Sequence, residues 1–349
     1  MTNSGKISWR SPSNIALVKY WGKKGVQLPG NPSVGMTLSG CFTETSIEFK
    51  KNGEKNDLTF RFYFDDQIHI HFEKRLKDFL ALAGKQLPSI RSLHLIINSK
   101  NSFPHSAGIA SSASAFSSLA LCLCSIDRKL SGKSIPDEEF FRKASFLARL
   151  GSGSSCRSVY GGWTLWGETA GIENSSDNYA IPVSRLVHKN FLTYYDAILL
   201  VNSEEKPISS SKGHRLMRSN PYREVRTDTG KKNTLKLLHA LTQGNEKIFR
   251  DVVESEAASL HAMFLTSRPY YILIKPETLH ILNLLKIFRK ETGLEFSFTL
   301  DAGPNIHLLY GDDIRSRMLS FIRSELLQYC EKGKWIDDKL GSGPEMIEN

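Results

Sequence analysis

The sequence has no apolar run long enough to cross a membrane. A transmembrane helix needs roughly 20 consecutive apolar residues, and no segment of the 349-residue chain approaches that length. The first ten residues, MTNSGKISWR, also lack the apolar centre of a secretory signal peptide. We therefore expect a cytoplasmic protein without a membrane partner.

Cysteine is scarce, and its spacing is not that of a metal site. The five cysteines include no CxxC pair and form an odd set, which argues against a zinc site and against a disulfide framework. We expect reduced thiols and no side chains that form a metal site by themselves. Cys156 lies in a serine-rich segment, but no nearby histidine marks it as an activated nucleophile, so packing is its expected role.

Low apolar content and internal repeats are also absent. With 40% hydrophobic and 23% charged residues, the composition is typical of a soluble globular protein and excludes a disordered chain. The length exceeds the roughly 250–300 residues at which single cores stop growing, so we expect two lobes. A polar stretch, GIENSSDNYAIP, precedes the apolar segment YDAILLV, and we place the domains at residues 1–188 and 189–349.

Acidic residues are outnumbered by basic ones, 36 to 46, which gives a formal net charge of +10. Such a charge suits nucleic acid, an acidic surface or a polyanionic small substrate. The basic residues are scattered, and no aromatic RNA-binding signature is present. Phosphorylated metabolites fit at least as well, so a basic nucleotide- or RNA-binding protein is kept only as the non-enzyme alternative.

Strand and helix patterns alternate through the whole chain. Residues 7–20 predict two short strands around Pro12, and a hairpin is expected at Asn52 and Gly53. Buried strands are expected at 93–99 and 195–201, a strand–turn–strand at 296–310, and helices at 69–82, before 130, at 137–150 and up to about 288.

Residues 151–162, GSGSSCRSVYGG, place an arginine and four serines between glycines. The glycines permit unusual backbone conformations, while the serine hydroxyls and the Arg157 guanidinium are donors that can hold an anion. A flexible Gly/Ser loop is the alternative. Arg157 favours the anion site, because linkers rarely place a bidentate carboxylate or phosphate binder at their centre.

Two further segments combine glycine with serine. Residues 103–116, FPHSAGIASSASAF, open onto a long helix whose N-terminal N–H groups and dipole would favour phosphate, although no GxxxxGK[ST] motif is present. The small residues could instead serve only close packing. Residues 206–216, KPISSSKGHRL, are either another anion contact or a solvated turn.

Three charged residues have equally open interpretations when taken one at a time. Lys19 and Lys23 lie four residues apart and could protect a solvated edge strand. Asp301 precedes Ala-Gly-Pro-Asn and could only cap its turn.

Six segments resemble, in order, the motifs of the diphosphomevalonate decarboxylase family within the GHMP kinase superfamily. They are NIALVKYWGKK, LPGNPSVGMTL, FPHSAGIASSASAF, GSGSSCRSVYGG, TLDAGPN and GSGPE, from about residue 14 to 345. The resemblance implies an α+β, two-lobe GHMP kinase-like fold. Its N-terminal nucleotide-binding lobe would contain a mixed sheet with helices, its C-terminal lobe would be ferredoxin-like, and the active site would lie in the cleft between them.

The resemblance also implies an activity of the mevalonate pathway of isoprenoid biosynthesis. This is the ATP-dependent decarboxylation of mevalonate 5-diphosphate to isopentenyl diphosphate, ADP, phosphate and CO2, through phosphorylation of the 3-hydroxyl, with ATP and Mg²⁺ as cofactors. A mevalonate 3-kinase and a phosphomevalonate decarboxylase share the fold and are the alternatives. The presence of Lys19, Arg157 and Asp301 together favours the decarboxylase. We expect a homodimer and no nucleic-acid partner.

The family's motifs imply a role for each site residue. Asp301 would face the substrate's tertiary 3-hydroxyl, Lys19 would lie beside Asp301, and Arg157 would grip the substrate carboxylate. The other residues expected to bind substrate are Asn14, Tyr20, Lys23, Ser152, Ser154 and Ser210. Those expected to bind ATP are Pro104, Gly108, Ser111 and Ser112.

Overall fold

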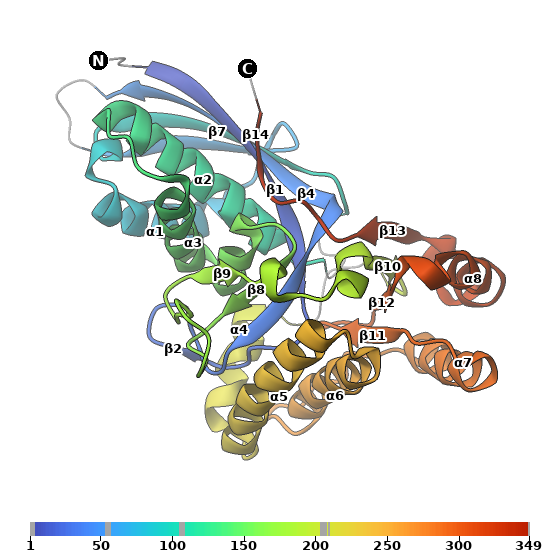
Figure 1. Cartoon of the computed structure of the whole chain (residues 1–349). Helices are drawn as coiled ribbons and strands as arrows, with labels where there is room; N and C mark the ends of the chain where they lie inside the picture. The colour runs from blue at the N-terminus through green and yellow to red at the C-terminus, as the bar shows by residue number, and fades with distance from the viewer. Residues whose placement is uncertain (1–3, 53–56, 105–108, 203–207, 209, 348–349) are drawn as a thin grey trace.

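A computed structural model describes residues 4–52, 57–104, 109–202, 208 and 210–347. Two main sheets organise these residues, one of eight strands and one of four, and helices pack on both (Figure 1). The α+β class expected from the sequence is confirmed. None of the described helices is long and apolar enough to span a bilayer.

The larger sheet is built around one long strand, β4 (Ser33–Lys51). Along its length β4 pairs with β1 (Ser4–Ala16). On its other edge it pairs first with β8 (Trp163–Trp166) and then with β7 (Leu93–Asn101). The remaining strands are β5 (Thr59–Phe64), β6 (Gln67–Ile68), β9 (Ala180–Pro182) and β14 (Glu345–Ile347), and a separate pair consists of β2 (Lys23–Lys24) and β3 (Leu28–Pro29).

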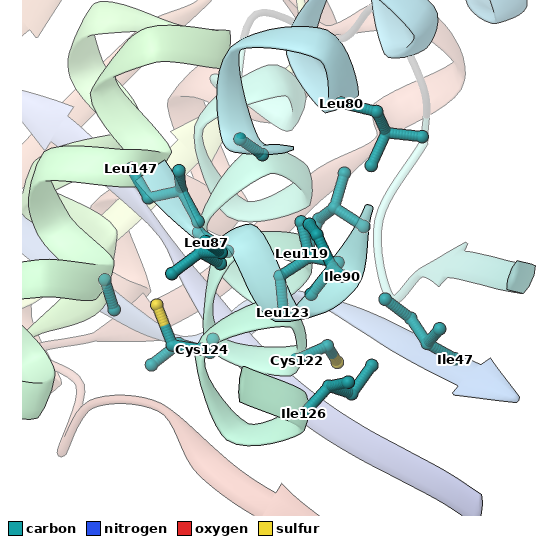
Figure 2. Close-up of a cluster of buried hydrophobic side chains, with 14 of the residues drawn as sticks. Ile47, Leu80, Leu87, Ile90, Leu119, Cys122, Leu123, Cys124, Ile126 and Leu147 are labelled. Carbon is teal, nitrogen blue, oxygen red and sulfur yellow. The ribbon is translucent and has the colours of Figure 1, made fainter. Parts of the chain in front are cut away.

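One face of this sheet is covered by three helices: α1 (Ile70–Gln86), α2 (Ser111–Ser131) and α3 (Asp137–Gly151) (Figure 1). Figure 2 shows apolar side chains of α2, including Leu119 and Leu123, packed among side chains from neighbouring elements such as Ile47 of β4. The many buried alanines, serines and cysteines of α2 bring it close to the sheet. All five cysteines are buried and free, which fits their expected role as small packing residues.

The smaller sheet has the strand order β11-β12-β10-β13 and is antiparallel throughout. Its strands are β10 (Tyr195–Leu199), β11 (Ser297–Leu300), β12 (Ile306–Tyr310) and β13 (Trp335–Lys339). The helices around it are α4 (Ser210–Leu216), α5 (Arg223–Gln243), α6 (Glu246–Leu265), α7 (Pro276–Thr292) and α8 (Arg315–Phe321). With its fourth strand beside its first and its third strand between the first and second, this lobe has ferredoxin-like topology.

The expected break at Pro12 is a bulge inside one continuous strand. β1 runs for 13 residues, and its register against β4 shifts between Pro12 and Asn14. A proline has no N–H for the ladder, and a bulge removes the need for one without ending the strand. Lys19 then lies in the bend that follows β1, not in a second strand.

The hairpin expected at Asn52 and Gly53 is wrong. β7 lies between β4 and β5, antiparallel to β4 and parallel to β5. Asn52 donates its N–H to the carbonyl oxygen of Ser92 at 2.7 Å, so the end of β4 lies beside the start of β7. Gly53 lies outside the described residues. The alternating pattern identified each strand correctly but contained no information about which strand would be its partner.

A buried carboxylate ties the two sheets together. Asp338, on β13, is 2% exposed. Its Oδ1 accepts from the N–H groups of Ser39 and Gly40 at 2.9 and 2.7 Å, and its Oδ2 accepts from Cys41 at 2.8 Å. These residues form a bend in β4, so one side chain of the smaller sheet satisfies successive main-chain donors of the larger sheet.

We expect Asp338→Asn to lower the free energy of unfolding by about 1–3 kcal/mol, because an amide would direct N–H groups at donors that need an acceptor. Asp337→Asn is the matched control on the same strand, since Asp337 pairs with the partly exposed Arg315, and such pairs contribute about 0–1 kcal/mol. Urea denaturation of both variants measures the difference. Equal losses in the free energy of unfolding in the two variants would contradict the role of Asp338 in joining the two sheets.

Candidate active site

A cavity of about 390 Å³ is lined by residues from both halves of the chain. This volume is within the usual range for a small-molecule site. Most of the site residues expected from the sequence line it: Asn14, Lys19, Tyr20, Lys23, Ser111, Ser112, Ser152, Ser154, Arg157 and Asp301.

Three expected residues are not among the lining residues that the structure describes. Pro104 is exposed and lies outside the cavity wall. Gly108 lies outside the described residues. Ser210 begins α4, but its side chain also lies outside what the structure describes.

An ion pair joins the two lobes at the cavity. The Lys19 Nζ lies 2.7 Å from Asp301 Oδ1, although the two residues are 282 positions apart. The lysine side chain is 3% exposed and that of the aspartate 27% exposed. Lys19 follows β1 and Asp301 follows β11, so the ends of two strands from different sheets place an acid–base pair at one point in the cavity wall.

Arg157 lies in a buried 3₁₀ helix, η2 (Gly153–Val159), so residues 151–162 do not form the flexible loop that was the alternative. Its Nε and Nη2 donate to Asn14 Oδ1 at 3.0 and 2.9 Å, and its Nη1 donates to Ser33 Oγ at 2.7 Å. Both acceptor side chains are neutral. Burial lowers the pKa of Arg157, and a buried cation held by neutral groups favours an anion in the adjoining cavity.

Gly35 of β4 makes room for this arginine. A Cβ at Gly35 would lie 2.9 Å from Arg157 Nε, which is closer than packed side chains allow. The acceptor Asn14 is itself fixed, since its Nδ2 donates to Ser158 Oγ at 2.7 Å and to the Ser154 carbonyl oxygen at 3.2 Å. The guanidinium is therefore oriented before any ligand binds.

The N-terminus of α2 opens onto the same cavity. Ala110 has a left-handed backbone (φ 48°) and provides no side-chain cap, so the first N–H groups of the helix are not satisfied by a cap. Ser112 Oγ lies 3.2 Å from Ser152 Oγ, which joins this helix end to the segment before η2. Uncapped N–H groups, the helix dipole and serine hydroxyls together form a suitable phosphate site.

Two further residues line the cavity: Arg75, which sequence reasoning missed, and His214, which it included only within residues 206–216 as part of a possible anion contact. Arg75 of α1 donates to the Gly151 carbonyl oxygen at 3.1 Å and covers the Phe116 ring. His214 stacks on Tyr20, with ring centroids 4.8 Å apart. Burial and the charge of Arg75 lower the pKa of Lys23 to about 8. Arg75 lies three residues after Phe72, so it is next to the apolar side of α1. This position is the sequence feature from which its place at the cavity could have been predicted.

An apolar part of the cavity was not expected either. It is lined by side chains from β5, β7, α1 and α2 and from the segment between β7 and α2: Phe62, Phe64, Phe72, Ile97, Phe103 and Leu119. These residues are far apart in the sequence, and each fits an ordinary core pattern. The wall of the cavity thus combines cationic side chains with apolar ones.

Comparison with known protein families covers most of the chain. Residues 11–180 match the diphosphomevalonate decarboxylase-like N-terminal domain, and residues 197–343 match the mevalonate 5-diphosphate decarboxylase C-terminal domain. The diphosphomevalonate decarboxylase of Debaryomyces hansenii is 28% identical over 325 residues, which cover 89% of this chain and 81% of the relative. The Bos taurus enzyme is 27% identical, with coverages of 91% and 80%.

Solved structures show the same relationship. Mevalonate diphosphate decarboxylase from Staphylococcus aureus is 26% identical with a TM-score of 0.82, over 99% of this chain and 98% of the other. The Legionella pneumophila enzyme is 29% identical with a TM-score of 0.77, over 94% and 99%. A structure of MDDEF in complex with MVAPP, AMPPCP and magnesium is 26% identical with a TM-score of 0.80, over 99% of both chains. The chain belongs to the diphosphomevalonate decarboxylase family.

Proposed function

We propose that this protein catalyses the ATP-dependent decarboxylation of mevalonate 5-diphosphate to isopentenyl diphosphate, ADP, phosphate and CO2. The observation that carries the proposal is one cavity that contains both the Lys19–Asp301 ion pair and the buried cation Arg157. Phosphoryl transfer to the 3-hydroxyl needs the ion pair, and binding of the substrate carboxylate needs Arg157.

Asp301 is the group that orients the 3-hydroxyl and accepts its proton. A tertiary alcohol is a poor nucleophile, so a carboxylate within hydrogen-bond reach contributes directly to its attack on phosphorus. The Lys19 ammonium, 2.7 Å from Asp301, fixes that carboxylate and adds positive charge where phosphoryl oxygens would lie. Holding both groups before the substrate arrives avoids reorganisation during the transfer.

The nucleotide fits the part of the cavity between α1, α2 and β5. The apolar part of the cavity would take the adenine ring, and the N-terminus of α2 with Ser111 and Ser112 would take the phosphates. The described residues include no group of three or more His, Cys, Asp or Glu side chains suited to a metal. Mg²⁺ commonly binds through phosphates and one or two carboxylates, and Asp301 is a carboxylate in the cavity wall. When bound, Mg²⁺ would neutralise phosphate oxygens.

Arg157 is the residue that would hold the substrate carboxylate. When the new 3-phosphate leaves, positive character builds on C3, and the C–C bond to the carboxylate breaks to supply electrons to it. The C–C bond to the carboxylate must align with the C3–O bond that breaks, so that its electrons form the new double bond to C3 as CO2 leaves. A guanidinium already fixed by Asn14 and Ser33 is suited to hold the carboxylate in this position with two donors.

The diphosphate would lie at the end of the cavity occupied by Lys23, Arg75 and Tyr20. Lys23 and Arg75 supply positive charge, and burial raises the pKa of Tyr20 to about 12, so its hydroxyl stays a donor. Ser152 and Ser154 line the same cavity and can add hydroxyl donors. This cluster of donors favours a diphosphate over an unphosphorylated substrate.

We also propose the domain division 1–188 and 189–349, a cytoplasmic location and a homodimer. The two family matches end at residue 180 and begin at residue 197, which supports the division, although β14 returns to pair with β1. Five free thiols suit a reducing compartment. Light scattering tests the homodimer.

The substrate and reaction are tested by incubating the protein with ATP, Mg²⁺ and, in turn, mevalonate, its 5-phosphate and its 5-diphosphate. With the diphosphate we expect ADP and CO2 in a one-to-one ratio. In the variant Asp301→Asn we expect turnover to be lower by about 10²–10⁴-fold, with nucleotide binding retained. ADP without CO2 from every substrate would favour the 3-kinase. Preference for the 5-phosphate would favour the phosphomevalonate decarboxylase. Asp301→Asn activity within about threefold of wild type would exclude Asp301 as the base.

We expect Arg157→Gln to lower CO2 release on the order of a hundredfold, because glutamine supplies neither the charge nor the paired donors. The dissociation constant for substrate should change less, since the diphosphate contacts remain. Arg149→Gln is the matched control: Arg149 is also buried, but it donates to the carbonyl oxygens of Asn178 and Val26 and is not part of the cavity wall. Similar losses of CO2 release in the two variants would mean that Arg157 is only structural.

Lys23 predicts a pH-dependent affinity for inorganic pyrophosphate. It is charged below its pKa of about 8 and neutral above it. The advantage of wild type over Lys23→Met, measured by calorimetry at each pH, should therefore be nearly full at pH 7 and fall about tenfold between pH 7 and pH 9. Lys24→Met, which alters the exposed neighbour, should retain the wild-type profile. A constant ratio across this range would place Lys23 outside the anion site.

A further inference from the structure

Helix α6 contacts the main chain of Lys19 through a fully buried carboxylate. Glu256 Oε2 accepts from the Lys19 N–H at 2.8 Å and from Arg226 Nη2 at 2.5 Å, and the same Nη2 donates to the Lys19 carbonyl oxygen at 2.7 Å. Asn233 Nδ2 donates to Glu256 Oε1 at 2.6 Å. Both peptide groups of Lys19 are therefore fixed by side chains from the opposite lobe.

The same helix packs against β11, the strand that leads to Asp301. His261, five residues after Glu256 on α6, lies close enough to Asp301 for the backbone of Asp301 to influence the pKa of its imidazole. Burial and the charge of Lys19 lower the pKa of His261 to about 4, so the imidazole is neutral at pH 7. One helix thus contacts the main chain of Lys19 and supports the strand that leads to Asp301.

We propose that Glu256 and His261 are positioning residues that set the distance between the Lys19 ammonium and the Asp301 carboxylate. This inference rests on the proposed function, in which that pair orients and deprotonates the 3-hydroxyl. Neither residue is part of the cavity wall, so each acts through the residue it holds. Helix α6 thus fixes the spacing between the ends of β1 and β11, which belong to different sheets.

The geometry of Arg226 distinguishes this role from simple stabilisation. Its Nε and Nη1 are buried without a hydrogen-bond partner among the described residues, while its Nη2 contacts both Glu256 and Lys19. A buried pair arranged only for stability would satisfy those donors. A Cβ at Gly230 would lie 2.9 Å from Arg226 Nη1. The lack of a side chain at Gly230 on α5 therefore leaves room for the Arg226 guanidinium.

The test is Glu256→Gln, compared with Glu254→Gln two residues away on α6. Glu254 pairs with Arg289 of α7, is 18% exposed, and contacts neither Lys19 nor Asp301. We expect Glu256→Gln to lower kcat by about tenfold or more, with little change in KM for ATP, since a displacement of 1 Å can cost about a hundredfold. Glu254→Gln should retain kcat, and thermal melting of both variants shows any loss of stability.

His261→Leu provides a second route that removes no charge and should fold even if Glu256→Gln does not. We expect a several-fold lower kcat at nearly unchanged KM. Combining each variant with Lys19→Met separates positioning from structure: if Glu256 acts through Lys19, Glu256→Gln should have little further effect in that background. Independent, multiplicative losses would overturn the proposal for Glu256, and a wild-type kcat in His261→Leu would overturn it for His261.

The two levels of inference fail differently. If Lys19→Met and Asp301→Asn retain full activity, the proposed function of the pair is wrong and the positioning role falls with it. If both lose activity while Glu256→Gln matches Glu254→Gln in kcat, the catalytic assignment stands and only the positioning by α6 is overturned.

Discussion

The ion pair between Lys19 and Asp301 is the contact on which the rest of the site depends. An ammonium group that is 3% exposed needs a compensating charge, and the nearest carboxylate lies on the opposite lobe. The docking of the lobes and the assembly of the active site are therefore one event. Asp338, which joins β13 to the bend in β4, and Glu256, which joins α6 to Lys19, extend the same principle: buried carboxylates satisfy main-chain donors across the junction.

Most of the charged side chains that line the cavity are cations. The cations Lys19, Lys23, Arg75 and Arg157 line the cavity, whereas Asp301 is the one carboxylate among the lining residues that the structure describes. Such a distribution attracts anions and raises their local concentration.

The Lys19–Asp301 pair and the α2 N-terminus suit phosphoryl transfer. In the function that we propose, Arg157 is the residue that distinguishes a decarboxylase from a kinase, because it would bind a carboxylate beside the hydroxyl that is phosphorylated. The fixing of Arg157 by Asn14 and Ser33, and the space left by Gly35, are thus part of specificity even though they lie behind the cavity wall.

Local sequence determined the helices, most strands and the short polar motifs, because periodicity and capping act over a few residues. It determined less about partners. Strand β7 lies between β4 and β5, and β1 continues through Pro12 with a shift in register. Arg75 and the phenylalanines of the cavity wall come together only in the folded structure. Residue types at positions 19, 157 and 301 pointed to anion chemistry by resemblance, but only the tertiary structure brought Lys19 and Asp301 within 2.7 Å. The physical reason is that strand pairing and lobe docking depend on contacts hundreds of residues apart, which no local pattern encodes.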